Sequence, residues 1–499
     1  MRLHSILLVG ICSVLFAQAA EKNKAAGTVE DVTQRIGEHI SQGKFSAAMW
    51  GVKIVSLESG ATIFETNAHK LLKPASNAKT FSGALALDVL GANYKIKTSL
   101  LAKSAPDASG TFKGDLVIYG RGDPTFSARF QDGSYTNLFG RLIEAFRRAG
   151  IRRVEGDLVG DETFFAGPRF GANWTWDDLQ YYYGAEVSAL SYQDNVIDLF
   201  LKPGTKAGEP CAIELKPETK FLDLANRMRT TGTNVRPSVA VMRLPGERRA
   251  YVNGTLPVNS RGVTDAVTVP DPALWFVASL REELQRVGIQ VTGKVRTRSW
   301  PEHPKLAVAE WRELAFAESL PMSEIVAKML KPSQNLYAQL LLQQVGAHSK
   351  SRAAMAEDAG LMELRAFAKR AGIDAGEVLL DEGSGLSRSA LVTANALVGL
   401  HTYMARHPQG AIYREALPAP GEGTLRSRFR DLSSAKLRAK TGTLKYVNTL
   451  SGYIDTAVNE KLAFAVMLNA YDNDGSASSR DELDAIVRLL AGLREKTRK

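Results

Sequence analysis

Cysteine and histidine are scarce in this sequence, and the common metal and nucleotide motifs are missing. The chain has 499 residues but only two cysteines and seven histidines. No Cys-x-x-Cys pair and no His-Glu-x-x-His motif occurs. A Gly-x-x-x-x-Gly-Lys-Ser/Thr phosphate loop and a Gly-x-Ser-x-Gly nucleophile elbow are also missing. Zinc catalysis, nucleotide chemistry and histidine-based serine catalysis therefore lack support, and we expect no metal and no cofactor.

The composition is that of a soluble globular protein. Apolar residues make up 44% and charged residues 23%, which excludes a disordered, collagen-like or disulfide-rich chain. The formal net charge of +10 suits anionic partners such as nucleic acid, cell-wall polymer or lipid head groups. No dense Lys/Arg run of the kind that binds nucleic acid is present. We expect the charge to serve solubility first and affinity for the cell wall second.

The first 19 residues predict a cleaved secretory signal peptide. Arg2 precedes an apolar stretch over 6–16, and Ala17-Gln18-Ala19 fits an A-x-A cleavage site. The stretch is too short for a transmembrane helix of about 20 residues. A buried N-terminal strand is the alternative. We predict export, favour a periplasmic location, and expect the mature chain to be soluble or peripheral.

Export leaves one cysteine in the mature chain. Cys12 lies within the signal, where the preceding Ile11 is not the small residue that a lipid-attachment site requires. Cys211 then has no partner for an intramolecular disulfide. A chain of this length can bury a core large enough to fold without one.

The two ends of the chain predict one mixed α/β domain. Apolar periodicity and turn signals indicate these elements: a helix over 31–40, a hairpin of 48–57 and 61–66, a buried helix over 81–90, helices over 323–330, 336–345 and 355–371, strands over 437–449, 450–455 and 462–469, and a helix over about 480–493. The simplest topology closes both ends into one domain and inserts the middle as a loop-borne region.

The middle of the chain has a different pattern of secondary-structure signals. Short strand-like runs and many Gly, Pro and Asp turns predict a β-rich region with few long helices. Gly-Asp-Leu-Val at 114–117 recurs at 156–159, too little to indicate a solenoid. The predicted division is a signal peptide over 1–19, a first part of the α/β domain over 20–95, an insertion over 96–305, and a second part over 306–499.

A serine and a lysine one helical turn apart provide a nucleophile system. In Ser-x-x-Lys at a helix start, both side chains share one face, and neutral lysine can activate the serine. Three such pairs occur: Ser41–Lys44, Ser76–Lys79 and Ser433–Lys436. Chance alone gives about two in a chain like this, so the motif needs partners. Only Ser76–Lys79 opens a buried, apolar helix.

Two further motifs follow in order. Ser333-Gln334-Asn335 is the only Ser-x-Asn in the sequence and precedes a predicted helix. Lys440-Thr441-Gly442 is the only Lys-Thr-Gly, on a predicted strand, and chance gives roughly 0.1 of these at this length. Alone, Ser333 and Asn335 are equally well read as a helix cap, and Lys440 alone as a solvated strand residue. Their order and local structure together favour one catalytic site.

The three motifs resemble those of penicillin-binding proteins and serine β-lactamases. Ser76 and Ser333 are 257 residues apart, and Ser333 and Lys440 are 107 apart. The long first gap resembles the class C low-molecular-mass penicillin-binding proteins, the D-alanyl-D-alanine carboxypeptidase/endopeptidases of the penicillin-binding protein 4 type. Further segments that resemble this family are 122–125, 182–190 and 383–388. Asp381-Glu382-Gly383 departs from the family's Asp-Gly-Ser-Gly run.

The resemblance implies a β-lactamase/transpeptidase-like fold, an antiparallel sheet flanked by helices, and a D,D-peptidase that acts on peptidoglycan stem peptides and is acylated by β-lactams. It implies a role for each motif residue. Ser76 is the nucleophile and Lys79 its base, Ser333 relays a proton, and Asn335 holds Lys79 and the substrate amide. Lys440 sets the potential of the cleft. The substrate-binding residues are Thr441, Gly442 and Thr443, with the N–H groups of Ser76 and Thr443 as oxyanion donors.

Other readings remain open. A β-lactamase is disfavoured by the long insertion and by the lack of a Glu-x-x-Leu-Asn segment after Ser333. A non-catalytic wall-binding protein would suit the positive charge, but every motif residue is intact. A general serine esterase would not need a Lys-Thr-Gly that recognises a carboxylate. The basic end, 494–499, is expected to continue the last helix, either solvated or resting on anionic lipid. The balance of carboxypeptidase and endopeptidase activity, the diamino acid and the oligomeric state stay open.

Overall fold

The computed structural model describes residues 27–351, 353–433, 436–472 and 478–498. The predicted signal peptide, including Cys12, lies outside these residues. Cys211 is buried and unpaired within them. Among the described residues, no helix is both long enough and apolar enough to cross a bilayer.

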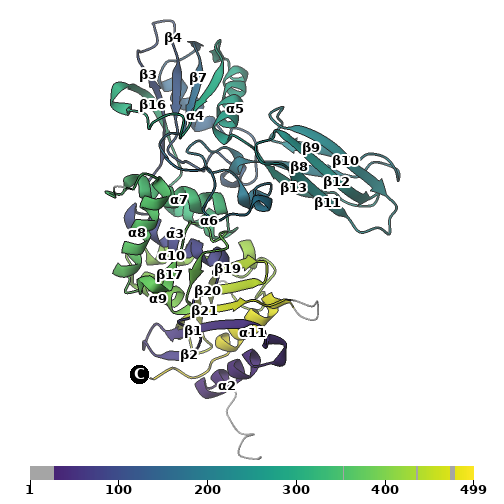
Figure 1. Cartoon of the computed structure of the whole chain (residues 1–499), viewed down its shortest axis with the longest axis vertical. Helices are drawn as coiled ribbons and strands as arrows, with labels where there is room; N and C mark the ends of the chain where they lie inside the picture. The colour runs from purple at the N-terminus through teal and green to yellow at the C-terminus, as the bar shows by residue number, and fades with distance from the viewer. Residues whose placement is uncertain (1–26, 352, 434–435, 473–477, 499) are drawn as a thin grey trace, which may run out of the picture.

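Both ends of the chain meet in one five-stranded antiparallel sheet (Figure 1). Its order is β19-β20-β21-β1-β2, with β1 at Met49–Ser56, β2 at Thr62–Thr66, β19 at Leu437–Leu444, β20 at Val447–Asp455 and β21 at Lys461–Asn469. The N-terminal β1 pairs along its whole length with β21. The two ends of the chain therefore contribute neighbouring strands to one sheet. The predicted first strand over 437–449 was too long, because a turn at 445–446 divides it between β19 and β20.

Helices cover both faces of this sheet, because alternate residues of a strand face opposite sides. On β21, Phe464 and Val466 belong to one core together with α2 (Val29–Ile40) and α11 (Ser479–Ala491). Ala463 and Ala465 belong to the core on the other face. The helices of that core are α3 (Ala78–Val89), α6 (Met322–Leu330), α7 (Asn335–His348), α8 (Ala356–Arg370), α9 (Ala394–Arg406) and α10 (Gly410–Ala416).

Helix α3 lies at the centre of this layer. Its first ten residues are buried, as the nearly charge-free sequence of this segment predicts. It packs on α6 and α7, which come from the other end of the chain. This packing brings the Ser76 segment beside the Ser333 segment.

The insertion contains a second five-stranded sheet of order β15-β7-β5-β3-β16. Its strands are β3 (Lys97–Ala102), β5 (Leu116–Tyr119), β7 (Leu158–Asp161), β15 (Val295–Arg298) and β16 (Arg312–Glu318). The repeated Gly-Asp-Leu-Val segments form adjacent parallel strands, in register at Leu116 with Leu158 and Val117 with Val159. Strand β16 lies after the predicted domain boundary between 305 and 306, yet it pairs with β3 of the insertion. This sheet therefore contains residues from both sides of that boundary. The rest of the predicted domain division stays a prediction.

Helices α4 (Gly140–Arg148) and α5 (Pro272–Arg286) belong to the insertion. The expectation of few long helices there missed α5, which has 15 residues. Consecutive apolar residues such as Trp275, Phe276 and Val277 obscure its helical period, and all three are fully buried.

Two further three-stranded sheets form a separate lobe of the insertion (Figure 1). One has the order β13-β8-β9 and the other β10-β12-β11. Their bounds are β8 Val196–Lys202, β9 Ala212–Lys216, β10 Asp223–Thr231, β11 Ser238–Arg243, β12 Arg249–Pro257 and β13 Val263–Thr268. The remaining short strands are β4 Thr111–Lys113, β6 Arg153–Glu155, β14 Gln290–Val291, β17 Val378–Leu379 and β18 Leu391–Val392.

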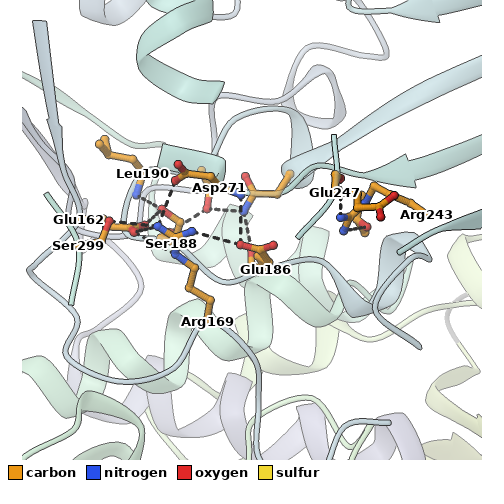
Figure 2. A network of polar contacts seen from close by, with 12 residues as sticks. Glu162, Arg169, Glu186, Ser188, Leu190, Arg243, Glu247, Asp271 and Ser299 are labelled. Carbon is orange, nitrogen blue, oxygen red and sulfur yellow. Dashed lines mark hydrogen bonds and ion pairs between the residues drawn. The ribbon is translucent and has the colours of Figure 1, made fainter. Parts of the chain in front are cut away.

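A polar network within the insertion, shown in Figure 2, centres on Arg169. Its guanidinium contacts Glu162, Glu186 at 3.3 Å and Asp271 at 3.1 Å. Asp271 occupies the N-cap position of α5 without a capping hydrogen bond from its side chain, and Glu162 follows β7. The three carboxylates raise the pKa of Arg169, although burial opposes them. The network connects β7 and α5 to segment 182–190, which contacts helix α7 of the α/β domain.

The basic end of the chain differs from the prediction. Helix α11 ends at Ala491, and the residues after it are not helical. Lys496 pairs with Glu58 at 3.0 Å, and the Thr497 N–H donates to Glu460 at 3.0 Å. The segment therefore packs beside the β1–β2 turn instead of extending the helix.

Candidate active site

Ser76 lies in a tight turn at the start of helix α3. The turn is a 3-10 helix over Ala75–Asn77, and α3 begins at Ala78. Ala75 has a positive φ of 47°, a conformation that costs an alanine energy and needs support from its surroundings. Asn77 supplies part of that support, since its amide group bonds Thr449 and Ser451 of β20 at 2.6 Å each.

Lys79 contacts the serine directly. Its Nζ donates to Ser76 Oγ at 2.8 Å and to the Ser384 carbonyl oxygen at 2.7 Å. The side chain is fully buried. Burial lowers the pKa of Lys79 to about 7, although the charge of Glu382 opposes the shift. A lysine with this pKa is neutral often enough near pH 7 to accept the serine proton.

Ser333 and Lys440 form a second hydroxyl–amine pair across the site. Lys440 Nζ donates to Ser333 Oγ at 2.9 Å and to the Thr441 carbonyl oxygen at 2.7 Å. Ser333 has a positive φ of 68°. Burial, and after it the charge of Lys79, lowers the pKa of Lys440 well below its ordinary value. The two buried ammonium groups repel each other, so the site disfavours the state in which both are charged.

The Lys-Thr-Gly segment lies on β19, the edge strand of the sheet. The Thr441 hydroxyl donates to Thr424 Oγ1 at 2.8 Å, while Thr443 is exposed. A Cβ on Gly442 would lie 2.6 Å from the Pro74 carbonyl oxygen and 3.0 Å from Ala75. A glycine at this position therefore lets the serine turn pack against the strand. This reason is separate from the substrate-binding role that the family resemblance implies for Gly442.

One cavity of about 560 Å³ collects these groups. It is lined by Ser76, Ser333, Asn335, Thr441 and Thr443, with Lys79 and Lys440 buried beneath its wall. The amide nitrogen of Asn335 donates to the Tyr183 carbonyl oxygen at 2.8 Å. A hydrogen bond from Asn335 to Lys79, which the resemblance implies, is not among those of the described residues. Ser384 takes that place.

Sequence reasoning missed several residues of this cavity. Glu382 is fully buried, and its carboxylate accepts from the N–H and hydroxyl of Ser384 at 2.7 and 2.6 Å and from the Gly385 N–H. It thus holds the loop whose carbonyl holds Lys79. The cavity wall also includes Asp178, Tyr183, Arg388 and Thr424. The family-like segments 182–190 and 383–388 contain only Tyr183 and Arg388 among these residues.

The two other Ser-x-x-Lys pairs lie in different surroundings. Ser41 is the C-cap of α2 and is exposed, and Lys44 pairs with Glu482 at 2.6 Å. Ser433 is exposed as well. Neither serine lines the cavity of Ser76. Within the described ranges, no cluster of three or more His, Cys, Asp or Glu could hold a metal ion.

A family model described as "D-Ala-D-Ala carboxypeptidase 3 (S13) family" matches residues 32–492. The chain belongs to this family. The match covers the α/β domain and the whole insertion, so the resemblance carried by the three motifs extends over the described fold. The chain is therefore a hydrolase, a penicillin-binding D,D-peptidase of the S13 serine peptidases.

Individual relatives agree with the S13 assignment. The chain is 30% identical to a D-alanyl-D-alanine carboxypeptidase of Actinomadura sp. (strain R39), covering 96% of this chain and 88% of the relative. It is 25% identical to a D-alanyl-D-alanine carboxypeptidase of Haemophilus influenzae, covering 92% of each. The crystal structure of penicillin binding protein 4 from Haemophilus influenzae superposes with a TM-score of 0.75 at 25% identity, covering 93% of this chain and 99% of that one.

Proposed function

We propose that this S13 peptidase removes the terminal D-alanine of peptidoglycan pentapeptide stems and also cleaves the D-alanyl cross-link between stems, both through one acyl-enzyme on Ser76. The observation that carries the proposal is the 2.8 Å contact between Lys79 Nζ and Ser76 Oγ, made by a buried lysine whose pKa lies near 7. A serine hydroxyl alone is a weak nucleophile, and an adjacent base corrects this.

In the acylation step, Ser76 Oγ attacks the carbonyl carbon of the penultimate D-alanine while its proton passes to Lys79 Nζ. The N–H groups of Ser76 and Thr443 stabilise the oxyanion, and losing one such donor typically costs about 10²–10³ in rate. The C–N bond then breaks, and Ser333 relays to the leaving nitrogen the proton that Lys79 took from Ser76, which returns Lys79 to its neutral form. Lys440, bonded to Ser333, polarises the hydroxyl and keeps the proton on Lys79 labile.

The C-terminal end of the pentapeptide substrate lies along β19, which carries Lys440-Thr441-Gly442. The hydroxyls of Thr441 and Thr443 bind the carboxylate next to the scissile bond, and Asn335 binds the substrate amide. Water then hydrolyses the ester and frees Ser76. A β-lactam uses the same attack, and without a Glu-x-x-Leu-Asn segment after Ser333 we expect its ester to persist. β-Lactams are therefore inhibitors in this account.

Export completes the proposal, because peptidoglycan lies outside the cytoplasm. Residues 1–19 are proposed to direct the chain there as a cleaved signal, and a periplasmic location follows if the cell has an outer membrane. The mature chain then keeps all catalytic residues.

Defined muropeptides test the proposal. The mature protein and its Ser76→Ala variant are incubated with pentapeptide monomer and with cross-linked dimer, and products are read by mass spectrometry. We expect loss of one alanine from the monomer and conversion of dimer to monomers, both absent in the variant. If the wild type converts neither substrate, the proposal is wrong. Steady turnover of a chromogenic cephalosporin would then favour the β-lactamase reading.

A further inference from the structure

We propose that a second cavity, next to the active site, binds the neighbouring stem peptide of a cross-linked substrate. This inference rests on the proposed cleavage of cross-links. The cavity has a volume of about 630 Å³, within the range of sites that hold peptides and small ligands. It lies where the lobe strands β8 and β13 meet the turn before α7.

The two cavities adjoin each other. Tyr182 and Pro332 line both. Ser333 lines the active-site cavity, and the next residue, Gln334, lines the second one. The Ser-x-Asn turn is therefore the partition between them, and a chain that leaves the active site beside Ser333 enters the second cavity.

The second cavity adjoins the leaving-group side of the scissile bond. Ser333 is the proposed proton donor to the leaving nitrogen, and Thr441 binds the carboxylate beside that nitrogen. Thr441 bonds Thr424, and Arg426, two residues further along, lines the second cavity. A terminal D-alanine ends at Thr441. A leaving group that continues as a second stem peptide extends beyond Thr441, and our proposal directs it toward Arg426.

The polar groups of the cavity suit a peptide that carries carboxylates and amide N–H groups. The side chain of Arg426 is exposed and forms no ion pair among those of the described residues, so it is available to a carboxylate. Asp198 and Asp265 also line the cavity and offer acceptors for N–H groups. Asp198 is held by the Tyr135 hydroxyl at 2.6 Å, which fixes its orientation.

A neighbouring cation is already neutralised. Arg129, which also lines the cavity, pairs with the buried Asp194 at 2.8 Å. Asp194 in turn accepts from Gln334 at 3.2 Å, so this pair braces the partition. Arg426 is therefore the cation whose replacement should affect the second stem and leave the partition intact.

The test compares cross-linked dimer with pentapeptide as substrates of two cavity variants and one control variant. Arg426→Glu should lower kcat/KM for cross-linked dimer about tenfold, mainly through KM, with pentapeptide hydrolysis and the benzylpenicillin acylation rate changed less than twofold. Thr264→Trp, which adds bulk at an exposed residue of the cavity wall, should act in the same direction without changing charge. Arg365→Glu, an exposed residue of α8 that lines neither cavity, is the charge control.

Equal losses on dimer and pentapeptide in Arg426→Glu, or unchanged dimer cleavage in both cavity variants, would overturn the inference. If the wild type hydrolyses pentapeptide but not dimer, the inference fails and the carboxypeptidase activity stands. If it converts neither substrate, the proposed function fails and takes the inference with it.

Discussion

At the scale of single residues, burial is the main cause of the reactivity of this site. Lys79 and Lys440 are both fully buried, and each bonds one hydroxyl of the cavity wall. For Lys79, burial outweighs the charge of Glu382 and brings the pKa to about 7. Removing a charged group from water disfavours its charged form, so Lys79 can serve as the general base that we propose, without a histidine.

The acylation rate should follow the neutral fraction of Lys79. Because the amine accepts a proton only when uncharged, the rate constant for acylation by benzylpenicillin should fall about tenfold per pH unit below pH 7 and level off above it. Stopped-flow measurement between pH 5 and 8 tests this. A rate that is flat down to pH 5 would show that Lys79 is not the base.

Glu382 acts on the reaction through Lys79. Glu382→Gln should slow acylation about 10- to 100-fold, because an amide cannot accept from both the Ser384 and Gly385 N–H groups, and charge-assisted bonds of this kind contribute about 1.5–3 kcal/mol each. Since the charge of Glu382 raises the pKa of Lys79, the rising limb of the pH profile should also move to lower pH.

Asp381→Asn is the matched control, because Asp381 bonds Ser387 and Asn173 instead of the residues around Lys79. A slower Glu382→Gln enzyme with an unmoved pH profile would indicate a purely structural role for Glu382 and contradict its electrostatic coupling to Lys79.

At the scale of elements, helices α7 and α8 connect to the active-site loop through a buried carboxyl group. Gln339 of α7 donates to Glu357 of α8 at 2.7 Å and accepts from the Gly383 N–H at 2.6 Å. Burial raises the pKa of Glu357 to about 8. The folded protein therefore binds a proton there that the unfolded chain releases above about pH 4.5.

This proton makes stability depend on pH. The unfolded state binds fewer protons between about pH 4.5 and 8, so the free energy of unfolding should fall as pH rises, by about 1.4 kcal/mol per unit from this group. Glu357→Gln should remove that dependence and raise the thermal midpoint at pH 7.5 relative to the wild type. Glu302→Gln, at an exposed glutamate that is not among the charges acting on Glu357, should not. Parallel midpoint profiles for wild type and Glu357→Gln from pH 5 to 8 would contradict the assignment.

Elements differ in how well the sequence predicts them. The hairpin of β1 and β2 was predicted from its turn signal and the helices from α6 to α8 from their apolar period. Helix α3 was predicted from its apolar, nearly charge-free sequence. The turn between β19 and β20 was misplaced, since the predicted boundary between the two strands fell after 449 and the turn lies at 445–446. The packing of the chain end beside Glu58 depends on contacts 438 residues apart, which no local pattern contains.

At the scale of the whole molecule, the fold explains why three motifs spread over the sequence make one site. Pairing of β1 with β21 and packing of α3 on α7 bring the chain ends together around the insertion. The motif residues could be predicted because each carries its own chemistry. The role of Glu382 could not, since its partners are backbone N–H groups whose positions only the folded loop defines.

The identity of the nucleophile is the central claim, and a single adduct tests it most directly. The mature protein is incubated with benzylpenicillin and analysed by intact-mass and peptide-mapping mass spectrometry. We expect one penicilloyl group per chain, on the peptide that contains Ser76, and none in Ser76→Ala. An adduct that persists in Ser76→Ala, or that maps to Ser41 or Ser433, would contradict the account.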